Sequence, residues 1–276
     1  FGLEPLKQLT DRIRKIKPAQ LKPVSLDNVP EELAPVQQAL NILLKEIDDL
    51  MAREKRWIAD AAHELRTPLT NIITQTQVGL SKSRAVVDYQ ELLFSNLEEL
   101  ERLTKMVNDM LWLAKTQNGL VKPVQNTLKS HDEIEALFEY FDALAEDSLI
   151  TFKKKGQNLC FYCDKLHFRQ LLSNLLSNAI RYAPKGSSIT VNSEIFTADK
   201  ICISVINTGE RIPSEHLPYL FDRFYRPDKS RQRHSDGAGL GLAIVKALAQ
   251  ANGGNIEVSS NNQTTSFKVY LNLVKS

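Results

Sequence analysis

The chain has 276 residues, 42% hydrophobic and 25% charged, which is typical of a soluble globular protein of about two domains. This composition excludes collagen, low-complexity disorder and a disulfide scaffold, and a net charge of +2 argues against nucleic acid as the main partner. Three cysteines fit a reducing compartment. The chain has no apolar run of about 18 residues, so we expect no membrane span within it. It begins with Phe1 rather than Met, so we expect a piece of a longer protein.

Apolar residues recur at heptad spacing in the first part of the chain. Two such runs, 6–16 and 33–50, flank a connector that contains prolines, and the second run keeps its phase as far as Ala61. Steps of alternately three and four residues are typical of helices that pack as a bundle or coiled coil. We therefore expect helices on both sides of the connector, with a first domain over 1–52 and a second over 53–118.

A third heptad run extends from Leu93 to Ala114. A second apolar row lies beside it: Leu103, Met106, Met110 and Leu113. So wide a stripe suits a four-helix bundle, yet the chain offers only two long helices here, over about 53–83 and 88–117. We therefore expect an all-α bundle that a homodimer completes. The alternative is that these helices pack on the chain's own C-terminal domain.

The remainder, residues 119–276, mixes strand-like and helical runs. The strand-like runs are Ile150–Phe152, Ile189–Glu194, Ile201–Val205, Ile256–Ser259 and Phe267–Leu273. The helical runs are His131–Glu146, Leu166–Arg181 and Gly241–Ala251. Strands and helices around one sheet predict an α+β two-layer sandwich. The long polar stretch between Gly209 and Gly237 is typical of a functional lid or of disorder.

His63 is a candidate nucleophile at the edge of the helical seam. A neutral imidazole is a good nucleophile near physiological pH, and the carboxylate of Glu64 beside it can orient it or take its proton. Thr67 lies one turn later on the same face, and Pro68 removes a helical hydrogen bond there. The alternatives are an ordinary surface histidine, or a zinc ligand for which Thr67 is a poor partner.

Two further motifs have the chemistry of phosphate binding. Asn174 and Asn178 share one face of an otherwise apolar helix, and with Arg181 nearby their amide oxygens can hold hydrated Mg²⁺ against phosphate oxygens. The alternative is a pair of buried asparagines tied to the backbone. The second motif is a glycine run before a helix, which lets backbone N–H groups approach an anion; it consists of Gly237, Gly239 and Gly241.

The glycine run is neither a Walker loop, because no Gly-Lys-Ser/Thr follows, nor the dinucleotide fingerprint, because Leu242 takes the place of a glycine. Upstream of it, residues 221–226 combine aromatic and basic side chains. This run fits a lid that docks by its aromatic residues and neutralises a triphosphate better than it fits a nucleic-acid surface.

In their order along the chain, these motifs resemble those of the sensor histidine kinases of bacterial two-component systems. Five strings resemble the H, N, G1, F and G2 boxes of that family: 61–68, 174–182, 207–212, 221–225 and 237–241. Residues 1–50 resemble a HAMP linker, which in this family joins a membrane helix to the bundle. The G1 and F boxes are similar to those of the heavy-metal and polymyxin sensors.

The resemblance implies that His63 attacks the γ-phosphate of ATP, with Glu64 as general base, before the phosphoryl group passes to an aspartate of a response regulator. Thr67 would position a water that dephosphorylates this partner. The resemblance also implies a homodimer and a transmembrane helix upstream of this fragment. The fragment would then be the cytoplasmic part of a protein of the bacterial inner membrane.

The resemblance further implies an ATP site with Mg²⁺ on Asn178. The other nucleotide-binding residues would be Asn174, Arg181, Tyr182, Asn207, Gly209, Phe221, Phe224, Arg231, Gly237, Gly239, Gly241 and Leu242. One departure concerns the G1 box, which in the family reads Asp-x-Gly-x-Gly, whereas this chain has Asn207 first and Arg211 last. An Asn oxygen still accepts a hydrogen bond from the adenine amino group, so we expect adenine binding to persist with lower affinity or altered discrimination.

Two other functions stay open at this point. One is a gyrase- or chaperone-like ATPase, which lacks the bundle with His63. The other is a nucleotide-binding scaffold or a phosphatase-dominant homologue with weakened kinase activity. The departures at Asn207 and Arg211 suggest this alternative.

The remaining histidines and the tryptophans have structural expectations only. We expect surface or loop positions for His131, His167, His216 and His234. We expect packing within the bundle for Trp57 and Trp112.

Overall fold

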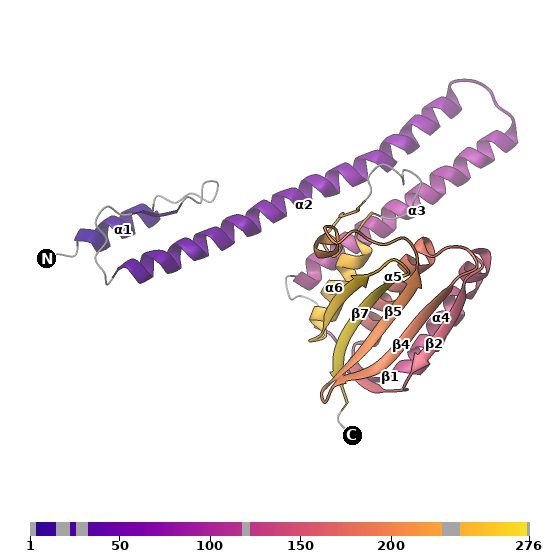
Figure 1. The fold of residues 1–276 in the computed structure, drawn as a ribbon. Helices are drawn as coiled ribbons and strands as arrows, with labels where there is room; N and C mark the ends of the chain where they lie inside the picture. Colours follow the sequence, from indigo (N-terminus) through magenta and orange to yellow (C-terminus); the bar gives the residue numbers. More distant parts are fainter. Residues whose placement is uncertain (1–3, 15–22, 26–32, 118–121, 228–237, 275–276) are drawn as a thin grey trace. The chain divides into compact units, whose positions relative to one another are not determined.

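A computed structural model describes residues 4–14, 23–25, 33–117, 122–227 and 238–274 (Figure 1). The chain divides into two compact units, Phe1–Thr67 and Pro68–Ser276. No helix in the described ranges combines the length and the hydropathy that crossing a bilayer requires. The expected division into three domains, after residues 52 and 118, stays a prediction.

The first heptad runs form helices, as predicted. Helix α1 spans Glu4–Arg14, and helix α2 spans Ala34–Leu80. The second heptad run and the helix expected over 53–83 are therefore parts of one helix of 47 residues. The helix is continuous because the heptad phase is unbroken and Pro68, the proline inside it, removes a single backbone donor.

The connector is fixed to α2 through the backbone of Val24. Its N–H donates to Asn41 Oδ1 at 2.7 Å, and its carbonyl oxygen accepts from Gln37 Nε2 at 2.8 Å. The Val24 side chain is buried with Leu9 of α1 and Leu44 of α2. A small apolar core thus joins α1, the connector and α2.

Helix α3, Val86–Gln117, has two apolar rows with different surroundings. Met106 and Leu113 of the second row are buried, and α3 packs on helix α6, Gly241–Ala251. The large apolar residues of the heptad row are each at least 41% exposed in the described chain: Leu93, Leu97, Leu100, Val107 and Leu111. Packing on the C-terminal domain, the alternative raised by the sequence, thus holds for the contact of α3 with α6, while the large apolar side chains of the heptad row stay exposed in the described chain.

The domain after α3 is built on a seven-stranded sheet. Its strands are β1 (Asn126–Lys129), β2 (Thr151–Gly156), β3 (Cys160–Cys163), β4 (Ser188–Thr197), β5 (Lys200–Thr208), β6 (Asn255–Ser260) and β7 (Thr264–Leu273). The order across the sheet is β1-β3-β7-β5-β4-β2, and β6 also pairs with β7. Strands β2 and β4 are parallel, and the other pairs are antiparallel.

Three helices cover one face of this sheet (Figure 1): α4 (Ser130–Asp147), α5 (Lys165–Tyr182) and α6. Helix α5 lies on the central strands β5 and β4, α4 lies on β2, and α6 lies on β6 and β7. Alternate strand residues point into this layer because the side-chain period of a strand is two. Those at the centre are at most 2% exposed: Ile201, Ile203, Val205, Phe267, Val269 and Leu271.

The predicted fold class is confirmed, since a helical region precedes an α+β sandwich. Each predicted strand-like run overlaps one of β2 and β4 to β7, although Ile150 precedes β2, and the predicted helical runs correspond to α4, α5 and α6. Strands β1 and β3 were missed. Each has four residues, too few to display an alternating pattern, and β1 buries only Leu128.

Glu133 of α4 is a buried acid that ties α4 to α5. Its side chain, 9% exposed, accepts from Arg169 Nε at 2.8 Å and from Lys165 Nζ at 3.1 Å. Burial raises the pKa of this carboxyl, but hydrogen bonds and the charges of Arg169 and Lys165 outweigh burial, so its pKa lies below the ordinary value of 4.5.

We expect Glu133→Gln to lower the free energy of unfolding by about 1–3 kcal/mol at pH 7, because the two cations lose a buried charged acceptor. A depressed folded-state pKa stabilises the fold fully above the unfolded value of 4.5, and the gain is lost as pH falls through the folded pKa. The gap between wild type and variant therefore narrows under acid conditions. Native-state hydrogen exchange of the α4 and α5 amides, followed as a function of pH, measures this difference in the free energy of unfolding.

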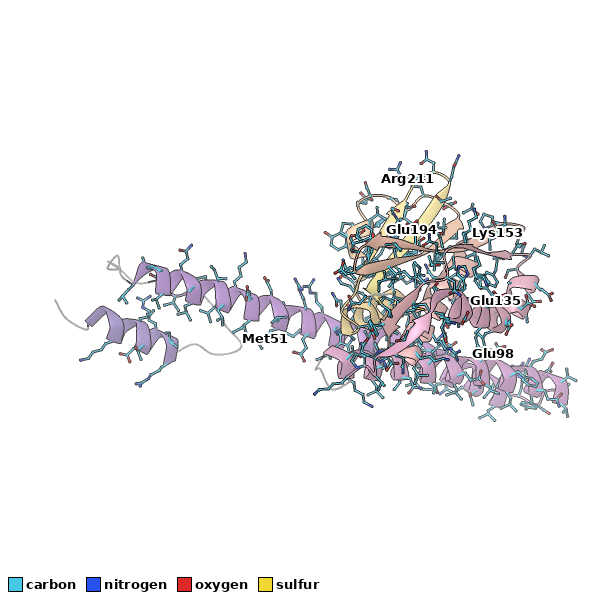
Figure 2. The ribbon with its side chains drawn as sticks, turned by 90° about the horizontal axis from the view of Figure 1, so that it is seen from below. Met51, Glu98, Glu135, Lys153, Glu194 and Arg211 are labelled. Atoms are coloured by element: carbon cyan, nitrogen blue, oxygen red, sulfur yellow. The ribbon has the colours of Figure 1, made fainter. Side chains whose placement is uncertain are left out.

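Glu135→Gln is the matched control on the same helix (Glu135 is labelled in Figure 2). Glu135 pairs with Lys154, but its side chain is 56% exposed, so the change should stay within about 0.5 kcal/mol. The prediction is contradicted if both variants lose the same free energy of unfolding, or if the loss in Glu133→Gln does not depend on pH. The buried ion pair of Glu133 would then not be the source of the stabilisation.

Candidate functional site

His63 lies within α2 and presents an exposed imidazole. Thr67, one turn further on, is also exposed, and its Oγ1 donates to the His63 carbonyl oxygen at 3.4 Å. Pro68 is buried and has no N–H, so the carbonyl of Glu64 lacks its usual helical donor. In the described ranges, no group of three or more His, Cys, Asp or Glu side chains could hold a metal ion. The geometry is that of an accessible nucleophile.

A buried polar pair ends the apolar rows of β5 and β7. Asn207 continues the inward-facing row of β5, Thr265 continues that of β7, and the two residues are paired in the register. They are 4% and 5% exposed. Asn207 Nδ2 donates to the carbonyl of Thr208 at 2.9 Å, which leaves Oδ1 to accept from another group. A polar pair at the end of an apolar layer is suited to bind the polar edge of a base.

Sequence reasoning missed Thr265. In the sequence, Thr265 stands out only as a continuation of the alternate positions that Phe267 and Val269 occupy. That pattern places Thr265 beside Asn207 only once β7 is known to pair with β5. The strand register is thus what adds Thr265 to the site.

Helix α5 brings its two asparagines to the same region. Asn174 and Asn178 are one turn apart and half-buried. Asn174 Nδ2 donates to the carbonyl of Gln170 at 2.9 Å, while a Cβ added at Gly241 would lie 3.2 Å from Asn174 Oδ1. The amide nitrogen of Asn174 is therefore tied to the backbone, as the alternative expected, and its oxygen adjoins the start of α6.

Close backbone approaches bring the G1, N, F and G2 strings together. A Cβ at Gly209 would lie 2.9 Å from the carbonyl oxygen of Tyr182, at the end of α5. A Cβ at Gly239 would lie 2.9 Å from the backbone of Phe224, whose N–H donates to the Gly239 carbonyl at 3.0 Å. We call Gly239, Gly241 and the first turn of α6 the phosphate edge, because the first N–H groups of a helix can bind an anion.

The remaining predicted residues lie around this region. The ring of Phe221 packs edge-on against Phe267, with centroids 6.4 Å apart, which anchors the F box to β7. Arg181 is exposed in the last turn of α5, and Leu242 is half-buried in the first turn of α6. Two predicted residues lie outside the described residues: Arg231 and Gly237.

His167 and Trp112 do not lie where the sequence placed them. His167 is 6% exposed in the first turn of α5, and its Nδ1 lies 3.2 Å from Asn252 Nδ2. The ring of Trp112, near the end of α3, packs edge-on against it with centroids 5.7 Å apart. Burial lowers the pKa of His167, so its imidazole is neutral at pH 7. Trp112 therefore packs on the C-terminal domain, and His167 is an interior residue.

Three family models match successive parts of the chain. Residues 3–49 match the Sensor protein PhoQ-like HAMP domain, and residues 53–119 match the His Kinase A (phospho-acceptor) domain. Residues 163–275 match the Histidine kinase-, DNA gyrase B-, and HSP90-like ATPase family. The protein thus combines a histidine phosphoacceptor domain with an ATPase-type domain, which implies that the latter binds ATP.

Curated relatives match along nearly the whole chain. The sensor histidine kinase CusS of Escherichia coli K12 is 43% identical over 273 residues, which are 98% of this chain and 56% of that protein. The probable sensor kinase SilS of Salmonella typhimurium is 40% identical over 275 residues, 96% of this chain and 54% of that protein. The chain belongs to the sensor histidine kinases, and it spans about half the length of these relatives.

Solved structures share the fold. The histidine kinase AdeS of Acinetobacter baumannii superposes with a TM-score of 0.63 at 24% identity, over 76% of this chain and 98% of that chain. Full-length ShkA, solved in complex with AMPPNP, gives 0.60 at 21% identity, over 79% of this chain and 46% of that chain.

We expect Gly239→Ala to weaken ATP binding by about tenfold or more, because an alanine there is strained at φ +70° and its Cβ would displace the Phe224 backbone at the phosphate edge. Gly186→Ala is the matched control, since Gly186 has φ +79° but a Cβ there would meet nothing within 4 Å. Calorimetric titration with ATP compares the two. Equal affinities of both variants would mean that the close approach to Phe224 is irrelevant to the nucleotide.

We expect Asn207→Asp to lower the free energy of unfolding by about 1–3 kcal/mol at pH 7, because a buried carboxylate would face the Thr208 carbonyl that the amide now donates to. The loss should shrink in acid, where a protonated Asp donates to the same carbonyl. The control is Asn255→Asp at an exposed position of β6. Urea denaturation of the unliganded chain measures both, and an unchanged Asn207→Asp variant would contradict the role given to the amide.

Proposed function

We propose that the chain is the catalytic part of a sensor histidine kinase, which phosphorylates itself on His63 with ATP. The observation that carries the proposal is the convergence of the N, G1, F and G2 strings on one end of the sheet, beside the buried pair Asn207 and Thr265. The exposed His63 supplies the acceptor. The nucleotide-binding residues named from the resemblance, Arg231 and Gly237 included, are part of this proposal.

In the proposed reaction an imidazole nitrogen of His63 attacks the γ-phosphorus of ATP. An N–P bond forms, the bond between this phosphorus and the bridging oxygen breaks, and ADP leaves. Glu64, next in the chain, takes the proton from the other ring nitrogen, which keeps the imidazole nucleophilic. Charge building up on the leaving phosphates is stabilised at the phosphate edge by backbone N–H groups.

Mg²⁺ fits the residues at the end of α5. The amide nitrogen of Asn174 donates to the backbone, whereas its amide oxygen adjoins the phosphate edge. Asn178 lies one turn further along α5. Amide oxygens are hard ligands of the kind that Mg²⁺ accepts together with waters and phosphates. We assign Asn178 as the ligand, with Asn174 and Arg181 assisting at the phosphates. The bound cation would neutralise charge on the triphosphate.

The proposed partners follow from the helical region. The phosphoryl group would pass to an aspartate of a response regulator, and Thr67, one turn from His63, would position the water that dephosphorylates that partner. A second copy of the chain would cover the exposed heptad row of α3 and complete a four-helix bundle. We propose no nucleic-acid partner.

The proposed setting follows from the match to a HAMP domain over residues 3–49. Residues 1–276 would be the cytoplasmic part of a kinase anchored in the bacterial inner membrane by a helix upstream of this segment. The G1 and F boxes, together with the similarity to CusS and SilS, support the heavy-metal sensor subgroup.

Incubation of the chain with γ-labelled ATP and Mg²⁺ tests the function. We expect label on the protein that is lost in acid and kept in base, as phosphohistidine is. His63→Gln removes the nucleophile and should reduce the label to background, whereas the matched control His131→Gln, on α4, should label at the wild-type rate.

Other outcomes would assign another function. ATP turnover without a labelled protein would indicate an ATPase of the gyrase or chaperone type. ATP binding without turnover or label would indicate a scaffold, and label that survives in His63→Gln would place the acceptor elsewhere.

A further inference from the structure

The segment between β5 and the phosphate edge contains a histidine that the proposed reaction does not use. His216 precedes the short helix Leu217–Tyr219, and successive turns continue from there to Tyr225. The sequence indicated only a surface or loop residue. It does lie in a turn, but its side chain is only 25% exposed and contacts the end of the F box.

The contact is a hydrogen bond between two side chains. His216 Nδ1 lies 2.7 Å from the hydroxyl oxygen of Tyr225. Burial first, then the neighbouring phenol of Tyr219, and then the charges of Glu215 and Asp222, raise the pKa of the Tyr225 phenol. Glu215 Oε1 lies 3.7 Å from His216 Nε2 and favours the tautomer that carries its proton on Nε2, in which Nδ1 accepts the hydrogen bond of the Tyr225 hydroxyl. The ring of Tyr219, with its centroid 5.6 Å from that of Tyr225, supports the same side chain.

Tyr225 is next to the residue that closes on the phosphate edge. Phe224 has φ +58°, a left-handed conformation that is rare for an aromatic residue, and its N–H donates to the carbonyl of Gly239. Such a conformation persists only where its surroundings determine it. One side is held by Gly239, at φ +70°, and the other side by the anchored ring of Tyr225.

We propose that His216 is a positioning residue for the nucleotide's phosphates: by holding Tyr225 it keeps Phe224 against Gly239 and so sets the phosphate edge. The inference rests on the proposed function, because it takes ATP as the ligand of this site. His216 acts through Tyr225 and Phe224 and touches no reacting atom. Its loss should therefore affect ligands with phosphates and spare the base.

Calorimetric titration of the full chain with ATP, ADP and adenosine tests this. We expect Tyr225→Phe, which removes one oxygen atom, and His216→Leu to weaken ATP and ADP binding by about tenfold each, the value of one hydrogen bond. Adenosine binding should stay at the wild-type level. His216→Asn, whose amide oxygen can take the place of Nδ1 as acceptor, should restore ATP binding.

Two controls separate the hydrogen bond from other effects. The double variant of His216→Leu and Tyr225→Phe should bind ATP no more weakly than either single variant, because both remove the same bond. Glu215→Gln changes the residue whose Oε1 lies 3.7 Å from His216 Nε2. Because the Glu215 side chain is 79% exposed, this change should leave ATP binding at the wild-type level.

The proposal is overturned if the variants bind ATP as wild type does, if adenosine binding falls in parallel with ATP binding, or if the double variant loses the sum of both effects. Tyr225→Phe carries the test by itself if His216→Leu does not fold. Failure of the proposed function is a separate result, since the wild-type chain would then bind ATP without phosphorylating His63, or not bind it at all.

Discussion

The pairing register of β5 with β7 is the constraint on which the proposed nucleotide site depends. These strands supply the centre of the core, and their inward rows are apolar until Asn207 and Thr265. A shift of one residue would turn the apolar row of the shifted strand to the opposite face, which the hydrophobic effect opposes. The burial of Ile201, Ile203 and Val205 therefore also fixes where the polar pair lies. The site needs no dedicated scaffold beyond the core itself.

Close backbone approaches then connect this pair to the rest of the site. Gly209 lets the chain after β5 pass the end of α5, Gly241 adjoins Asn174, and Gly239 meets Phe224. Each approach joins segments that are distant in sequence, and those at Gly209 and Gly239 leave no room for a Cβ beside the neighbouring backbone. Asn207 is one of two departures from the family's G1 box, and its amide donates to the Thr208 carbonyl, as a carboxylate cannot. Arg211, the other departure, is exposed in the loop after β5 (Figure 2).

His63 and the candidate base-binding pair have opposite environments. His63 is on the surface of a long helix, where its imidazole is accessible, whereas the candidate base-binding pair is buried between a sheet and a helical layer. In the proposed reaction the nucleophile must reach both ATP and a second protein, which exposure permits, while a base is recognised best where water is excluded. The rows of α3 show a similar division: one is buried beside α6, and the other remains at the surface.

The sequence by itself determined the fold class, the three helices of the sandwich, five of its seven strands and the strings that converge on the site, because heptad spacing, alternation and glycine position are local properties. Tertiary structure alone decided the rest. Thr265 belongs beside Asn207 only through strand register, His167 is interior only because Trp112 and Asn252 pack on it, and His216 meets Tyr225 only through successive turns. These contacts join residues whose separation in sequence carries no periodic signal, so packing and hydrogen bonding in the folded chain had to bring them together.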